Sequence, residues 1–138
     1  MRRTNISTMV VCGLAAFGLS VPAVAKDIAF NPGEPVRFEA TVNDVREVPA
    51  GNPLPGIHVD AKINGRVEDI YLAPADFAAK YGVKVTKGQY ISITGTVKDG
   101  DAGTVLGREI TTGNYDPAHN IFRPTMTIYL RNDSGPLW

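Results

Sequence analysis

The stretch that decides the fold is VEDIYLAPADFAAKYGVKVTKGQYISITGTV, residues 67–97. It begins with a strand pattern, continues through a short helical segment and returns to a strand pattern. Pro74 suits the first position of a helix, Asp76 suits its positive end, and Gly82 suits the position after its last turn. Two turns of helix are not stable alone in water, so packing must hold this segment. The side chains expected to pack are Phe77, Ala78 and Tyr81.

Further strands are expected on both sides of this stretch. Their residues are 36–45, 57–63, 104–111 and 125–131, whereas residues 112–124 read as irregular. A helix inserted between the third and fourth strands of a small barrel is typical of the OB fold. We therefore predict an all-β domain with one short helix: a five- to six-stranded OB-fold Greek-key barrel, with the helix between strands 3 and 4.

The dipeptide Asn64-Gly65 is the strongest hairpin signal in the chain. A two-residue turn at this point fixes the register of the strands on either side. The expected pairs are Ile63 with Arg66, Val59 with Ile70 and Ile57 with Leu72, and on the other face His58 with Tyr71 and Asp60 with Asp69.

Asp60 and Asp69 would then be like charges directly opposite each other, which destabilises a sheet unless something compensates. One interpretation is that Lys62 or a nearby arginine neutralises them in solvent. The other is a weak site for a divalent cation made by Asp60 and Asp69, with His58 as a third ligand and Tyr71 on the same face. The identity of such a metal is unknown, and no other cofactor is indicated.

The N-terminus has the pattern of a secretory signal peptide. Two arginines precede an apolar core at residues 9–21, and an A-x-A site at residues 23–25 marks cleavage before Lys26. We therefore expect the mature protein in the periplasm. The expected organisation is a signal peptide at residues 1–25, a lead-in at residues 26–35 and an OB-fold domain at residues 36–138.

Composition excludes several classes of function. Cys12 is the only cysteine and lies in the leader, so the mature chain has no disulfide, thiolate metal site or cysteine nucleophile. The chain has 14 basic and 14 acidic residues, and loss of the two leader arginines leaves 12 against 14. Nucleic acid and stable membrane insertion after cleavage are therefore disfavoured. No hydrolase, zincin or P-loop motif is present, and we expect no enzymatic activity.

These observations favour a non-enzymatic binding module for a small ligand, a cation or an envelope partner. The alternative is an accessory subunit of an envelope redox or transport complex that acts by protein–protein contact. Trp138, at the end of the tail Pro136-Leu137-Trp138, is the candidate partner-binding residue, because a terminal tryptophan is a natural anchor; the alternative is that it folds back over the barrel. Tyr71, Tyr90, Tyr129 and Trp138 form either an aromatic platform or ordinary contacts between strands.

Four segments together resemble a group of small exported bacterial OB-fold proteins, among them the periplasmic bacterial OB-fold (BOF) family. They are the Asn64-Gly65 hairpin, LAPADF at residues 72–77, KGQYISITGTV at residues 87–97 and the tail LRNDSGPLW at residues 130–138. The resemblance covers most of residues 36–138 and implies a periplasmic module that binds a ligand or partner and not nucleic acid. Ala73 stands where the relatives have Gly, and Asn132 where they have Asp, so any role of that aspartate does not carry over.

Overall fold

The structure is a computed structural model that describes residues 28–31, 33–97 and 104–138. The expected signal peptide and its cleavage site lie outside the described residues. The strands are β2 (Val36–Val48), β3 (Gly56–Ile63), β4 (Arg66–Ala73), β5 (Tyr90–Val97), β6 (Thr104–Asp116), β7 (Ile121–Tyr129), β8 (Arg131–Asn132) and β9 (Gly135–Pro136), and the helix is α2 (Ala75–Tyr81). Among these described elements, no helix is long and apolar enough to cross a membrane.

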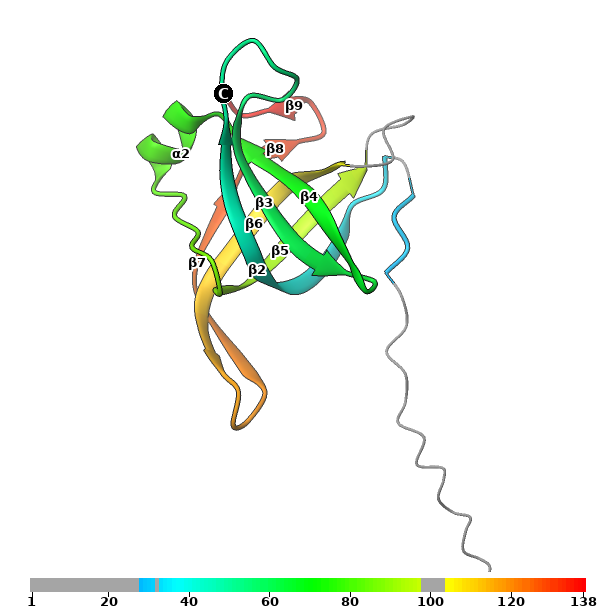
Figure 1. Cartoon of the computed structure of the whole chain (residues 1–138), viewed down its shortest axis with the longest axis vertical. Coiled ribbons are helices and arrows are strands. Elements are labelled where there is room, and N and C mark those ends of the chain that lie inside the picture. The colour runs from blue at the N-terminus through cyan, green and yellow to red at the C-terminus, as the bar shows by residue number, and fades with distance from the viewer. Residues whose placement is uncertain (1–27, 32, 98–103) are drawn as a thin grey trace, which may run out of the picture.

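A closed barrel of five strands, with one extra strand, forms the body of the molecule (Figure 1). The strand order is β4-β3-β2-β5-β6-β7, and a short parallel pairing between β4 and β6 closes the ring. The extra strand, β7, pairs with β6 alone. The predicted OB-fold-like barrel is therefore confirmed, and the helix lies between the third and fourth strands as expected.

The barrel is filled by the apolar side chains that alternate along its strands. The largest fully buried ones are Val42, Val59, Ile70, Leu72, Ile91, Ile93, Ile110 and Leu130. Burying a side chain of this size stabilises the fold by about 1.5–3 kcal/mol relative to exposure. Because alternation sends every second residue outward, the polar residues between these positions gather on the outer face of the same strands.

The β3–β4 hairpin has the predicted turn, in which Asn64 and Gly65 both take positive φ angles, 55° and 78°. The confirmed pairs are Ile63–Arg66, Val59–Ile70, His58–Tyr71 and Asp60–Asp69. The outermost predicted pair is wrong, because Ile57 lies opposite Ala73 and not Leu72. A register shift between Ile57 and His58 absorbs one residue at that end of the hairpin.

The helix runs from Ala75 to Tyr81, so Pro74 precedes it and does not take its first position as predicted. Gly82, with a φ of 71°, is the left-handed cap that was predicted. Phe77 and Ala78 are buried as expected. Tyr81 is not part of the core, since 51% of its surface is exposed. As the last residue of the helix it lies against the ring of Phe77, with 4.6 Å between ring centroids.

Residues 112–124 are not irregular, contrary to the sequence-based prediction. They belong to the long hairpin of β6 and β7, which projects beyond the barrel in Figure 1. Gly113 faces Pro124 at a register shift, and a Cβ on Gly113 would lie 2.2 Å from the carbonyl oxygen of Arg123. Asn120 closes the turn with a φ of 53°. The glycine, proline and asparagine that suggested a loop therefore form a bulge and a turn.

One end of the barrel, at the top of Figure 1, gathers three segments that are distant in sequence. They are α2, the loop of residues 49–55 between β2 and β3, and the C-terminal β8–β9 tail. The tail is held by a hydrogen bond from the Leu137 amide to the Leu130 carbonyl oxygen, 3.0 Å.

Gly56 connects the loop of residues 49–55 to β3 at a place with no room for a side chain. Its φ is 132°, and a Cβ there would lie 2.2 Å from the backbone oxygen of Ala73. We expect Gly56→Ala to lower the free energy of unfolding by about 3 kcal/mol, because strain in φ adds to the clash with backbone. Gly65→Ala is the control, since Gly65 has positive φ and open space around it, and should cost about 1 kcal/mol. Urea unfolding measures both, and equal losses would contradict the role of the close approach.

Candidate functional site

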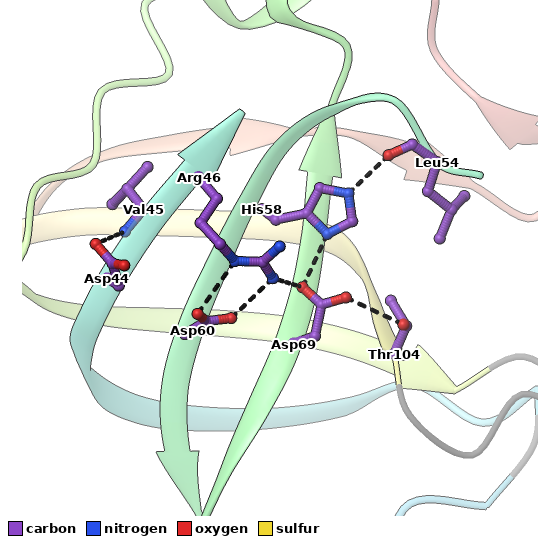
Figure 2. Close-up of polar contacts among 8 residues, drawn as sticks. All are labelled: Asp44, Val45, Arg46, Leu54, His58, Asp60, Asp69 and Thr104. Carbon is purple, nitrogen blue, oxygen red and sulfur yellow. Dashed lines mark hydrogen bonds and ion pairs between the residues drawn. The ribbon is translucent and has the colours of Figure 1, made fainter. Parts of the chain in front are cut away.

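Arg46, near the end of β2, lies between the two facing aspartates (Figure 2). Its Nε donates to Asp60 Oδ2 at 3.1 Å, and its Nη2 donates to Asp60 Oδ1 at 2.9 Å and to Asp69 Oδ1 at 2.8 Å. The hydrogen bonds to Asp60 raise the pKa of Arg46 still further, so the guanidinium keeps its charge. A guanidinium therefore occupies the space in which the predicted site would hold a cation.

The acidic row is longer than the sequence suggested. Asp44 on β2 lies opposite Asp60, which in turn lies opposite Asp69, so three carboxylates cross β2, β3 and β4 side by side. Asp44 Oδ1 accepts a hydrogen bond from the Val45 amide at 2.9 Å. Arg46 is the nearby arginine expected to neutralise the pair. Sequence reasoning did not single out Arg46 and missed Asp44, because it did not establish how β2 pairs with β3. The pattern of an arginine and an aspartate two residues apart on β2 was the available signal.

His58 is the most buried polar member of the cluster, with 4% of its surface exposed. Its Nδ1 lies 2.8 Å from Asp69 Oδ1, and its Nε2 lies 2.6 Å from the carbonyl oxygen of Leu54. The ring of His58 therefore links Asp69 on β4 to the loop of residues 49–55. Asp69 also accepts from Thr104 Oγ1 at 3.1 Å through its other oxygen.

Tyr71 is buried beside His58, with 5.1 Å between the two ring centroids. Its hydroxyl donates to the carbonyl oxygen of Pro55 at 3.0 Å, and so points at the loop and not at the two aspartates. Burial raises the pKa of Tyr71, which keeps the hydroxyl in its donating form. His58 and Tyr71 thus bind neighbouring carbonyls of the loop of residues 49–55, and together they fix its position above the sheet.

The structure therefore brings together three of the four predicted ligand residues, His58, Asp60 and Asp69, and leaves Tyr71 beside them. Each of the four already has a hydrogen-bond partner within the protein. Across the described residues, no group of three or more His, Cys, Asp or Glu side chains is placed to hold a metal ion. What the arrangement does is neutralise its own charges and anchor the loop.

Trp138, the predicted partner-binding residue, lies against the end of the barrel. Its ring is edge-on to Phe77 and to Tyr71, with centroid separations of 5.2 Å and 6.1 Å. The guanidinium of Arg131 lies 5.1 Å from the centre of the same ring, a cation–π distance. With 43% of its surface exposed, Trp138 both covers Phe77 and Tyr71 and faces solvent.

A groove runs between the helix, the extra strand and the tail. It encloses about 340 Å³ and is lined by Phe77, Tyr81, Thr127, Ile128, Tyr129 and Leu137. We call it the α2–β7 groove. No sequence signal predicted it, because its walls come from three segments whose relative positions depend on the closed barrel.

The four aromatic residues considered as a platform lie in different settings. Tyr71 and Trp138 contact each other, Tyr129 lines the α2–β7 groove, and Tyr90 stacks on Tyr115 with 4.1 Å between centroids. Burial, and then a 2.6 Å hydrogen bond to Glu39, raise the pKa of Tyr90 to about 12. These residues are therefore better described as cross-strand and end contacts than as one platform.

Arg46→Gln should leave Asp60 and Asp69 facing each other without a countercharge and lower the free energy of unfolding by about 1–2 kcal/mol. The effect of Asp60→Asn on the free energy of unfolding should then have opposite signs in the wild type and in the Arg46→Gln protein. It removes a hydrogen-bonded charge from the wild type, which destabilises, and removes a repulsion from the Arg46→Gln protein, which stabilises. Urea unfolding of the four proteins measures the cycle.

Arg66→Gln is the matched control for that cycle, because the Arg66–Glu68 ion pair has an arginine side chain that is 75% exposed. Its loss should change the free energy of unfolding by less than about 0.5 kcal/mol. The same sign for Asp60→Asn in both backgrounds would show that Arg46 does not offset the carboxylate repulsion.

Comparisons with known proteins add no family to this geometry. No family model matches the chain, and no curated protein and no solved structure matches it. The functional argument therefore rests on the residues themselves.

Proposed function

We propose that this protein is a non-enzymatic binding module that acts by protein–protein contact through the α2–β7 groove. The observation that carries the proposal is the distribution of exposed apolar side chains. Of the seven large ones in the described residues, all but Val67 lie on α2, β7 or the tail: Tyr81, Ile121, Met126, Tyr129, Leu137 and Trp138. Of these six, Tyr81, Tyr129 and Leu137 line the groove, and Trp138 packs on Phe77, which also lines it. Exposed apolar side chains gathered in this way are typical of an interaction surface.

The polar cluster supports the same choice by contrast. Arg46 fills the space between Asp60 and Asp69, and the remaining donors and acceptors of His58 face the loop of residues 49–55. A cation would have to displace this guanidinium, whereas the walls of the α2–β7 groove are mainly apolar side chains that a partner could cover. We therefore propose that the binding partner is a protein and not a small ligand or a cation. The leader pattern and the resemblance to exported OB-fold proteins support a periplasmic setting.

Photo-crosslinking in the producing cells tests this function. A photoreactive phenylalanine analogue at Tyr129, which is 62% exposed in the groove, should give one discrete adduct with a partner protein. The same analogue at Val67, which is 57% exposed on β4, is the matched control and should give none. Adding Tyr81→Glu should abolish the adduct at position 129, because the new charge would be desolvated by an apolar partner.

Two results would overturn the proposed function. One is the absence of an adduct at position 129, and the other is an adduct that forms equally at position 67 or survives Tyr81→Glu. Circular dichroism of each variant confirms that the barrel is intact, which both exposed positions should permit.

A further inference from the structure

The extra strand β7 has one free edge. Its other edge pairs with β6, and no backbone hydrogen bond joins the free edge to any other described residue. Half of the N–H and C=O groups of an edge strand point outward and can pair with another chain. The α2–β7 groove lies along this edge, because Thr127, Ile128 and Tyr129 form one wall of it.

Only one half of this edge carries the residues that discourage pairing. Arg123 and Pro124 stand in the first half, where a charge and a missing N–H protect an edge strand. Residues 125–129 are Thr, Met, Thr, Ile and Tyr, which favour strand pairing and include neither charge nor proline. The unprotected half is the one that faces the groove.

On the outer face of the sheet, a row of cross-strand neighbours ends at this edge. A cross-strand row runs from Glu39 through Ser92 and Thr111 to Thr127, and the last two share a hydrogen bond of 2.8 Å between hydroxyl oxygens. Inside such a row each residue has a cross-strand neighbour on both sides, and Glu39 and Thr127 are its two end members. Thr127 has a neighbour on one side only, and the groove lies on the other.

Two cations lie close to residues that form or cover the groove walls. Lys80 lies beside the groove, with its Nζ 5.4 Å from the ring centre of Tyr81. Arg131 lies under Trp138, and burial lowers the pKa of its guanidinium. Neither cation is ion-paired within the described residues, whereas Asp133 nearby is already paired with Arg108 at 2.8 Å. This leaves room for a carboxylate of an incoming chain.

We propose that the partner contributes an extended, acidic and apolar segment, which adds to the sheet as a new strand along residues 125–129. Its apolar side chains enter the groove against Phe77 and Ile128, and its carboxylates lie near Lys80 and Arg131. Main-chain hydrogen bonds to β7 supply affinity that depends little on sequence, and the groove and the cations supply the preference for this composition. The inference rests on the proposed function and specifies its binding mode.

A selection from random displayed peptides on the purified protein tests this mode without knowledge of the partner. The library is first depleted on the Tyr129→Glu protein, so that the retained peptides depend on the groove. The peptides should combine acidic and apolar residues. When they are synthesised with a single N-methyl group moved along the chain, affinity should fall by about tenfold at alternate residues and stay unchanged between them. That alternation follows because only every second N–H of an added strand faces β7.

Lys80→Glu should weaken the selected peptides by about fivefold or more at low salt, and Lys62→Glu, an exposed lysine on β3, should not. Strand addition is overturned if no peptide is selected, if N-methylation acts without alternation, or if Lys62→Glu and Lys80→Glu act equally. These failures are distinct from failure of the proposed function, which is decided by crosslinking in cells. A groove-specific adduct, together with peptides whose affinity does not alternate with the position of the N-methyl group, would support binding at the α2–β7 groove and refute strand addition to β7.

Discussion

The short parallel pairing of β4 with β6 is the constraint on which the rest of the molecule depends. Three residue pairs close the ring, from Asp69 opposite Thr104 to Tyr71 opposite Leu106. Because β6 is longer than this contact, its remaining residues pair with β7, which is left outside the ring with a free edge. The same contact brings Thr104 to Asp69 and so completes the polar cluster. Closure of the ring by β4 and β6 therefore produces both the polar cluster and the α2–β7 groove.

The polar cluster and the α2–β7 groove differ in whether their groups already have partners within the protein. In the polar cluster, Arg46 and His58 supply donors to the acidic row, so that few of its groups remain to bind anything else. Partly exposed charges that satisfy each other add modest stability but define the geometry of the strands that carry them. The α2–β7 groove has the opposite character, because its apolar walls gain from being covered. Tyr71 connects the two, with its hydroxyl on the loop and its ring against Trp138.

Short sequence patterns correctly predicted the features that neighbouring residues determine, such as turns and helix ends. The Asn64-Gly65 turn fixed the β3–β4 register up to the shift beside Ile57, and Gly82 ended the helix as expected. An arginine beside the two aspartates was expected, but its identity as Arg46 could not be derived, because it depends on how β2 pairs with β3 across the loop of residues 49–55 and an irregular register. The hairpin beyond residue 112 was missed for a related reason: the same glycine and proline suit a loop or a bulge, and only the partner strand decides between them. The groove required the complete tertiary arrangement.

The pairing of β4 with β6 also bears on the order in which contacts form during folding. The β2–β3 and β3–β4 contacts join segments that follow each other along the chain, so the three-stranded unit that holds Arg46 closes only short loops. Asp69 and Thr104 are 35 residues apart, and the ring closes only where β4 meets β6. Contacts of higher sequence separation are reached more slowly. We therefore expect Asp69 to gain Arg46 as a partner before it gains Thr104.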